Sequence, residues 1–535
     1  MTGRLAGRTL WVLIVAALLP YLNALPNDFT LDDHGLILHN QAVVAFDLAT
    51  LWGQDYWAGY DSSLRSGLYR PVTLTSFAAE FALFGRQPLG YHLNNLLLHL
   101  LVTLLSWSLF RRFAGASTAL WGAAVFAVLP GHSEAVLAIV GRADLLATVG
   151  SLAALLVWTG ADGWRRTLGG GCCFALALLS KEQAAVVPAL LLCVGWLQHR
   201  RDGQGWRWPP LVASAAILAV YLGLRQVLLG GIAVTEIQAL DNPLVELHGA
   251  ERVLAALAVA SRYALLLVAP ARLSADYSFG AIDVRHMPTG EIADGLLLVL
   301  LAGVATWWFV RRPETPGLAV MWLMVCFAPF VNVLFPIGTI LAERISYAPS
   351  VGYALGVGWA LDGARRHLGY RVVQRLGLAL LLVLGLRTAA RCTDWRDELQ
   401  LFGAVVAAYP ESARGHKGLA KALQDAGRVA EAEQEYRSAI EIYPRFDTAH
   451  YNLAILLHGT ARYEEALSHF DKACVLRPEF ADAHLNRGVT LSRLGRLQES
   501  RQATQRAAEL RPEWDAPRVN LQEINTAIDR QGEQR

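Results

Sequence analysis

Apolar stretches long enough to cross a bilayer recur through the first 390 residues. A spanning helix needs about 20 mostly apolar residues, because no water in the bilayer core can hydrogen-bond its backbone. Residues 1–390 contain only 50 Lys, Arg, Asp and Glu residues, whereas the much shorter segment 391–535 contains 42. The whole chain is 17% charged, against about 25% in ordinary soluble domains. The sequence therefore predicts a polytopic membrane domain, 1–390, followed by a soluble domain, 391–535.

We predict about 11 spans, with the N-terminus on the cytoplasmic side. Arginine clusters stay on that side of a membrane, and this chain has Arg4 and Arg8 before the first span and pairs at 111–112, 165–166, 200–201, 311–312 and 365–366. No small-residue cleavage site follows the first span, so we expect it to remain uncleaved. The C-terminus then falls outside. The predicted spans are 9–25, 93–110, 117–130, 144–160, 168–180, 184–198, 210–229, 294–310, 317–337, 349–362 and 372–389.

Two further apolar segments do not fit this count. Residues 252–270 are apolar enough to span, but a crossing there would invert every later arginine cluster. We predict a re-entrant or interfacial helix at this position. Residues 72–84 are too short to span and are predicted to form an interfacial helix in the first outer loop.

Four prolines in the soluble part are spaced 34 residues apart, at Pro410, Pro444, Pro478 and Pro512. This is the period of tetratricopeptide (TPR) repeats, which stack helix pairs into an α-solenoid. Small and aromatic residues recur in register within three units, 413–446, 447–480 and 481–514. Residues 394–410 resemble the second helix of a partial unit, and 515–535 are predicted to form a polar cap or tail. Such an array either binds an extended segment or only scaffolds an assembly.

Under this topology, acidic, basic and imidazole side chains gather on the outer face. The adjacent carboxylates Asp32 and Asp33 follow the first span, where one could act as a general base. A helix cap, a turn pair or a pair of metal ligands would use the same residues. The other acidic and imidazole candidates are His92, His132, Glu134, Asp144, Glu182 and Glu343.

Four cations lie near span ends on the same face, at Arg70, Arg142, Lys181 and Arg344. Fixed cations at this depth could stabilise a phosphate leaving group. Lys181 is notable because it is the only lysine before residue 417. Alternatively, these side chains extend to lipid headgroups, or form local ion pairs within 142–144, 181–182 and 343–344.

Seven segments of this chain resemble the transmembrane and TPR repeat-containing O-mannosyltransferases of the GT-C class of polytopic glycosyltransferases. They are LDDHGLILHN (31–40), YRPVTLTSFAAEFALFG (69–85), YHLNNLLLH (91–99), GHSEAVLAIVGRADLLA (131–147), LLSKEQ (178–183), LSADYSFGAI (273–282) and LAERISYAPSVGYAL (341–355). The TPR tail completes the architecture, although it is short beside the arrays of eukaryotic members. The composition, with 47 basic residues of which only four are lysine, suggests a bacterial member.

The resemblance implies transfer of a hexose, typically mannose, from a polyprenyl-phosphate donor to Ser or Thr hydroxyls of a protein outside the cytoplasm. It implies that Asp32 and Asp33 supply the base and that Arg70, Arg142, Lys181 and Arg344 contact the donor phosphate. An inverting reaction without cofactor or metal ion is expected. The expected location is a bacterial cytoplasmic membrane, with the active site and the TPR domain on the extracytoplasmic side, where the repeats would hold the acceptor.

Two other functions remain open on the sequence. The enzyme could modify a surface polysaccharide or a lipid-linked glycan, which would need no peptide-binding groove. The chain could also be a non-catalytic membrane scaffold whose repeats recruit an envelope assembly. Nucleic acid is not an expected partner, because the net charge is only +2. The six cysteines show no zinc or disulfide spacing.

Overall fold

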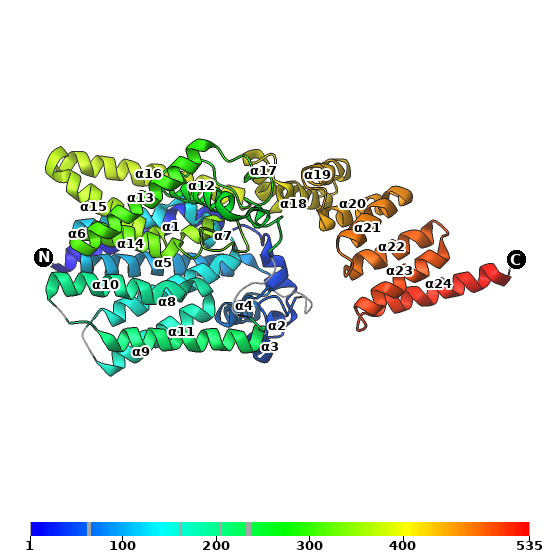
Figure 1. Cartoon of the computed structure of the whole chain (residues 1–535), viewed down its shortest axis with the longest axis horizontal. Coiled ribbons are helices and arrows are strands. Elements are labelled where there is room, and N and C mark those ends of the chain that lie inside the picture. The colour runs from blue at the N-terminus through cyan, green and yellow to red at the C-terminus, as the bar shows by residue number, and fades with distance from the viewer. Residues whose placement is uncertain (1, 61–65, 161–162, 204, 232–236, 534–535) are drawn as a thin grey trace. The chain divides into compact units, whose positions relative to one another are not determined.

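The structure is a computed structural model of the chain, and it describes residues 2–60, 66–160, 163–203, 205–231 and 237–533. Regular secondary structure among these residues is helical, without a β-strand, which confirms the predicted all-α class (Figure 1). The chain forms two compact units. Unit 1 comprises Met1–Ala275 and Val284–Leu401, and unit 2 comprises Asp276–Asp283 and Phe402–Arg535.

Unit 1 is a bundle of long apolar helices with short helices in the loops at one end. The long helices are α1 (Thr2–Leu18), α5 (Pro88–Phe113), α6 (Ala116–Val128), α8 (Arg142–Trp158), α9 (Trp164–Ser180), α10 (Val187–Asp202), α11 (Trp208–Leu229), α12 (Gly249–Val268), α13 (Thr289–Arg311), α14 (Thr315–Phe327), α15 (Ser350–Leu368) and α16 (Tyr370–Asp394). The shorter ones are η1 (Leu19–Ala24), η2 (His34–Leu38), α2 (Gln41–Val44), α3 (Leu48–Gly53), α4 (Pro71–Phe84), η3 (Pro130–His132), α7 (Ser133–Leu137), η4 (Ile139–Gly141), η5 (Glu182–Val186), η6 (Pro243–Glu246) and η7 (Glu343–Ser346).

Six of these helices are long and apolar enough to cross a membrane, and a bent pair, Ala116–Val128 with Pro130–Leu137, would make a seventh span. The chain is therefore a membrane protein, while the predicted number of about 11 spans stays a prediction. The predicted span 317–337 is wrong in length, because α14 already ends at Phe327. Pro329 and Pro336 follow, and proline cannot continue a helix. The segment predicted to be re-entrant or interfacial forms α12, and its depth in the membrane stays a prediction.

Close helix packing in unit 1 depends on glycine. A Cβ atom at Gly358 of α15 would lie 2.4 Å from the carbonyl oxygen of Thr118 on α6. A Cβ at Gly150 of α8 would lie 2.7 Å from the carbonyl oxygen of Cys173 on α9. Small residues let backbones approach closely where apolar side chains gain nothing by leaving lipid. These two glycines therefore allow close packing of α15 on α6 and of α8 on α9.

The arginine pairs gather at one end of unit 1. Arg112 donates to the Leu156 carbonyl oxygen (2.5 Å) and Arg201 to that of Phe113 (3.2 Å), so the last turns of α5, α8 and α10 meet there. Arg365, at the end of α15, donates to Ser117 Oγ near the start of α6 (3.0 Å). Clusters that are far apart in sequence thus share one end, as a common membrane side requires.

Unit 2 contains the repeats as antiparallel helix pairs. They are α18 (Ala413–Asp425) with α19 (Val429–Ile442), α20 (Asp447–Gly459) with α21 (Tyr463–Leu476), and α22 (Ala481–Arg493) with α23 (Leu497–Leu510). The partial unit forms α17 (Glu398–Ala408), and the predicted cap is a helix, α24 (Asp515–Glu533). Ala432, Ala439, Ala466 and Ala473 are fully buried, so the recurring small residues are the contact points of the helix pairs.

Unit 2 also contains a segment from far earlier in the sequence. Residues 276–283 contact the first repeat, where the Phe279 carbonyl oxygen accepts from the Ala413 amide (3.2 Å) and Ser412 Oγ donates to Asp276 (2.9 Å). The rings of Phe279 and Tyr443 lie 4.6 Å apart. The division between the units lies between Leu401 and Phe402, later than the predicted boundary at residue 390. The reason is that α16 continues to Asp394 and Trp395 is buried in the core of unit 1.

Candidate active site

The polar residues singled out from the sequence lie in loops and helix ends of unit 1. They come from the loop after η1, the start of α4, the α7–η4–α8 connection, the end of α9 with η5, and η7. Figure 1 shows α2, α3 and α4 together at this end of unit 1. Segments more than 100 residues apart therefore contribute to one region, whose geometry follows from their ion pairs and hydrogen bonds.

Asp33 is a fully buried carboxylate that fastens the first loop to the start of α8. Its Oδ1 accepts from the Val140 amide (2.9 Å), and its Oδ2 accepts from the amides of Thr30 (3.1 Å) and Ile139 (3.3 Å). Burial raises the pKa of Asp33 to about 7, although the three amide donors act in the opposite direction. With its lone pairs directed at backbone amides, this carboxylate is held in a fixed position.

Asp32 has the opposite environment. It is exposed, and it makes no hydrogen bond or ion pair with any residue that the structure describes. The preceding residue, Leu31, has φ = 53°, a left-handed conformation that costs a non-glycine residue about 1 kcal/mol or more. This turn lets adjacent carboxylates face different surroundings. Asp32 thus has free lone pairs at the surface of the site.

Three cations lie within electrostatic range of one another, and each is held by a carboxylate from another segment. Arg70 forms a bidentate pair with Glu182 (3.0 and 2.5 Å). Lys181 Nζ lies 2.6 Å from Asp144 Oδ2, and Arg344 Nη1 lies 2.6 Å from Glu134 Oε1. Both Arg70 and Arg344 act electrostatically on Lys181. We call Arg70, Lys181 and Arg344 the cation triad.

The alternative that these residues form ion pairs with their sequence neighbours is wrong. Lys181 and Glu182 are adjacent in sequence, but they pair with Asp144 and Arg70. Glu343 does not pair with Arg344; its Oε1 accepts from the Ser274 amide (2.6 Å) and lies 3.6 Å from Arg391 Nη2. Successive side chains on a turn or helix point in different directions, so sequence neighbours reach separate partners. The ion pairs therefore join segments rather than neighbouring residues.

The pKa shifts in this region follow from the pairing. Burial alone would raise the pKa of Glu182, but the Arg70 guanidinium brings it down to about 2. Burial lowers the pKa of Lys181, and Asp144 opposes this shift. The carboxylates of Glu134, first, and of Asp144 and Asp32 raise the pKa of Arg344. Asp32 is therefore close enough to the cation triad to interact with it.

Arg142 lies apart from the triad, in the interior of unit 1. It is completely buried, forms an ion pair with Glu80, and donates to Asn95 Oδ1 (2.9 Å) and to the Tyr91 carbonyl oxygen (3.2 Å). Its guanidinium also lies 4.9 Å from the centre of the Phe77 ring. These bonds connect α4, α5 and α8, so the surroundings of Arg142 are those of a packing residue.

The two histidine candidates are buried as well. His132 Nε2 lies 2.7 Å from Ser350 Oγ, and its ring packs against Phe126 (4.5 Å) and Tyr347 (4.6 Å). His92 is only 4% exposed on α5. Among the described residues no group of three or more His, Cys, Asp or Glu side chains could hold a metal ion, and the expectation that none is required stays a prediction.

Three residues of this region were not singled out from the sequence. Arg391 is buried beside Glu343, and Arg225 on α11 is buried and donates to the Gly67 carbonyl oxygen (2.7 Å). Tyr56 is buried with its ring 5.2 Å from the Arg70 guanidinium. A charge within the apolar stretch 210–229 could have drawn attention to Arg225. Neither Arg391, at the predicted domain boundary, nor Tyr56 carries such a signal.

Known proteins similar to this chain agree with both halves of the architecture. A family model described as tetratricopeptide repeat matches residues 393–445, 419–479 and 451–513. A protein O-mannosyl-transferase of Caenorhabditis elegans is 31% identical over 454 residues, covering 82% of this chain and 63% of the relative. The chain is a homologue of the TMTC protein O-mannosyl-transferases. Mouse TMTC3 is 29% identical, with 81% of this chain and 50% of the mouse protein covered.

This TMTC homologue thus spans between half and two thirds of the length of these two relatives. Among solved structures, the Archaeoglobus fulgidus oligosaccharyltransferase in the apo form is similar at 15% identity. The match covers 72% of this chain and 56% of that protein, with a TM-score of 0.43.

Proposed function

We propose that the TMTC homologue is a membrane glycosyltransferase that moves a hexose, typically mannose, from a polyprenyl-phosphate donor to Ser or Thr hydroxyls of extracytoplasmic proteins. The observation that carries the proposal is an exposed Asp32 that pairs with no described residue and lies within electrostatic range of Arg344, a member of the cation triad. A carboxylate and fixed cations are what transfer from a phosphate leaving group requires. The relatives named protein O-mannosyl-transferases supply the sugar and the acceptor class.

In the proposed reaction, Asp32 takes the proton of the acceptor hydroxyl as its oxygen attacks the anomeric carbon. A new carbon–oxygen bond forms, and the bond from that carbon to the phosphate oxygen breaks, with inversion. The leaving group is polyprenyl phosphate, which carries away the electron pair. Asp32 then releases the proton to water. No metal ion or other cofactor takes part in this scheme.

The cation triad would stabilise the charge that develops on the phosphate. The bidentate pair of Arg70 with Glu182 uses Nε and Nη2 and leaves Nη1 available, since no described residue bonds to it. Lys181 has three ammonium donors, of which Asp144 takes one. The side chain of Arg344 is 37% exposed. We propose that these three residues contact the phosphate and that Arg142, whose donors are used inside the bundle, supports the fold.

The decisive experiment compares three aspartates of the first loop in the purified full chain. The assay supplies polyprenyl-phosphate mannose and a Ser/Thr peptide. Asp32→Asn should lower transfer by at least about 100-fold, the usual lower range for a lost general base. Asp47→Asn is the matched control, because Asp47 caps α3 and asparagine caps helices equally well. Full activity of Asp32→Asn would overturn the mechanism, whatever the result for Asp33→Asn.

We further propose that unit 2 holds the acceptor polypeptide. The first helices of its repeats, α18, α20 and α22, are neighbours, and such helices form the extended binding surface of solenoids. Ile455 and Val489 occupy equivalent, half-buried positions on α20 and α22. Replacing both by serine should raise the KM for the peptide and leave the KM for the donor unchanged. Val475→Ser, at an exposed site on α21, is the control; equal effects of the two changes would argue against the groove.

A further inference from the structure

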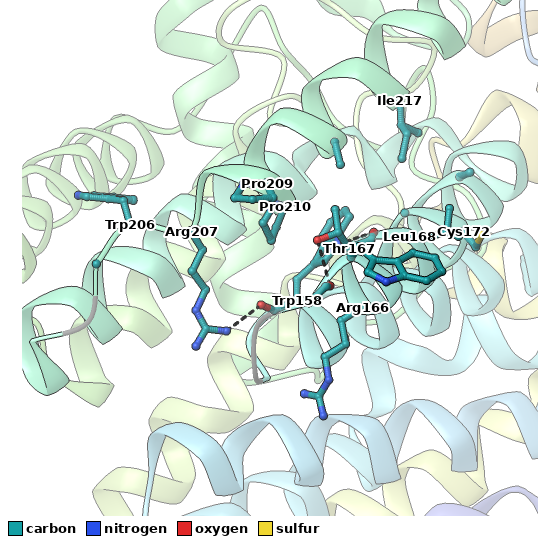
Figure 2. A pocket seen from close by; sticks show the side chains of 16 residues that line it. Trp158, Arg166, Thr167, Leu168, Cys172, Trp206, Arg207, Pro209, Pro210 and Ile217 are labelled. Carbon is teal, nitrogen blue, oxygen red and sulfur yellow. Dashed lines mark hydrogen bonds between the residues drawn. The ribbon is translucent and has the colours of Figure 1, made fainter.

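A cavity of about 1150 Å³ opens between α8, α9 and α11, away from the candidate active site (Figure 2). It lies at the last residue of α8 and the first turns of α9 and α11. Lys181, by contrast, directly follows the last residue of α9. A helix of 17 residues is about 25 Å long at 1.5 Å per residue. The end of the cavity at Trp164 is therefore separated from the cation triad by most of the hydrocarbon thickness of a bilayer, and the cavity extends along α9 as far as Ala175.

The walls of the cavity are largely apolar and are formed mainly by α9 and α11. Gly171 and Ala175 lie one turn apart on α9, and Ala213 and Ile217 lie one turn apart on α11. Because three of these four residues are small, they leave a groove between the two helices. Trp158, Trp164 and Trp206 are also among the lining residues, and tryptophan concentrates where hydrocarbon meets headgroups. The apolar lining of this groove suits an acyl chain.

The mouth of the cavity is positively charged. Arg166 and Arg207 line it, and none of the described lining residues is acidic. The guanidinium of Arg112 lies within electrostatic range of both. Figure 2 shows Arg207 donating to the Trp158 carbonyl oxygen, 3.3 Å away. Arg166 is exposed, and its guanidinium forms no hydrogen bond or ion pair with a described residue.

We propose that this cavity binds an anionic phospholipid from the leaflet opposite the candidate active site. The phosphate would lie between Arg166 and Arg207, and one acyl chain would lie along Gly171, Ala175, Ala213 and Ile217. Arginine clusters also attract anionic membranes without any site. A dedicated site differs because it needs both the charges at the mouth and the open groove behind them.

The test measures phosphatidylglycerol binding to the purified full chain by native mass spectrometry, with phosphatidylcholine as the neutral lipid. Arg166→Gln should weaken phosphatidylglycerol binding about fivefold, since each interfacial arginine contributes roughly that factor. This change removes no side-chain hydrogen bond or ion pair with a described residue. Ala213→Phe should weaken binding while leaving the charge unchanged, because it fills the groove. Millimolar inorganic phosphate should not displace the lipid.

Arg311 and Arg312 provide the matched control. Arg311 is the last residue of α13 and Arg312 follows it. This pair is predicted to lie on the same side of the membrane as Arg166, and neither arginine lines the cavity, so the double change to glutamine should leave specific binding intact. Equal losses in Arg166→Gln and in the control would overturn the proposal in favour of general membrane attraction. Unchanged binding in Ala213→Phe, or displacement of the lipid by inorganic phosphate, would also overturn it.

Discussion

Asp32 and Asp33 are neighbours in sequence whose surroundings assign them different tasks. The carboxylate of Asp33 accepts hydrogen bonds from three backbone amides, which fix the loop. Asp32 lies on the same turn and has no partner among the described residues. A general base needs free lone pairs and access to the substrate. In the proposed reaction, the fixed carboxylate of Asp33 would hold the loop in place while Asp32 transfers the proton.

The pH dependence of stability should report on Asp33. Its folded pKa of about 7 lies above the value of about 3.9 expected in the unfolded chain. The folded state therefore binds the proton more tightly, so the contribution of Asp33 is complete below about pH 4 and is lost as pH rises through 7. Thermal unfolding of Asp33→Asn in detergent should lack this loss between pH 5 and 8. Asp32→Asn should retain it, and the same slope in Asp33→Asn would contradict the assignment.

A second residue-scale prediction separates packing from phosphate binding. Arg142→Gln should lower stability by about 3–5 kcal/mol, because it leaves Glu80 unpaired in the interior. Adding Glu80→Gln should recover part of that loss, as measured by denaturant unfolding in detergent. The double variant should keep the KM for the donor, whereas Arg344→Lys should raise it by altering the fork of donors. A folded double variant with a raised donor KM would show that Arg142 binds the phosphate.

The residue types of the site could be predicted from the sequence, but their partners could not. Arg70 and Glu182 are 112 residues apart, and Arg344 and Glu134 are 210 apart. No periodicity in a single chain connects such positions. The different roles of Asp32 and Asp33 depend on the backbone turn at Leu31 and on amides of 139 and 140. Both features arise only after the helices have packed.

The same hydrogen bond recurs at the start of each repeat of unit 2. His416, His450 and His484 each lie within 3.1 Å, through Nε2, of the carbonyl oxygen of the proline six residues earlier. In the capping helix Arg518 takes the same position and donates to Pro512. Each bond connects the first helix of a unit to the turn that precedes it. His450 Nδ1 also lies 2.9 Å from His469 Nδ1, so one ring must donate and the other accept.

Acid should therefore loosen the repeats. Burial lowers the pKa of His450 and of His484. Burial and the charge of His450 together lower the pKa of His469 to about 4. The unfolded state, with a pKa of about 6.5, binds protons that the folded state excludes. Stability is thus present above pH 6.5 and lost as pH falls toward 4. Amide exchange of residues 447–476 in the full chain, corrected for intrinsic rates, should show falling protection over this range. His469→Phe should reduce the effect; constant protection would contradict it.

Helix contacts in unit 1 allow another prediction. Gly358→Leu should destabilise the bundle by about 1–3 kcal/mol, the usual cost of overpacking, because its side chain would collide with the backbone of α6. Gly363→Leu in the same helix is the control, since no atom lies within 4 Å of its added Cβ. Apparent melting temperatures in detergent distinguish the two. Equal shifts would indicate a helix-propensity effect rather than a packing effect.

Sequence periodicity is enough to predict the helix positions in unit 2. The 34-residue period predicts the third repeat at 481–514, and the structure contains α22 (Ala481–Arg493) and α23 (Leu497–Leu510) within it. Apolar length alone overextends the span at 317–337, where two prolines end the helix early. The assignment of 276–283 to unit 2 has no local signal, because its contacts are with residues more than 130 positions away.

The ion-paired acids and the arginine clusters lie at opposite ends of unit 1. The acids that pair with the cation triad lie at one end of unit 1, together with Asp32, which has no partner among the described residues, whereas the arginine pairs cluster at the other end. Buried ion pairs cost desolvation and are retained where geometry must be held. Arginine clusters at a membrane boundary instead set orientation. This division predicts that the proposed transfer and the proposed lipid site face opposite sides of the membrane.

Cysteine labelling can test that division directly. In a background without the six native cysteines, a cysteine at the exposed position 47 should react with an impermeant maleimide added to intact cells, because the first loop is predicted to lie outside. A cysteine at position 166 should react only after the membrane is opened, because arginine pairs are retained inside. Labelling of both positions from the same side would place the first loop and the start of α9 on one face of the membrane. Labelling in the reverse order would place Asp32 in the cytosol and remove the proposed extracytoplasmic reaction.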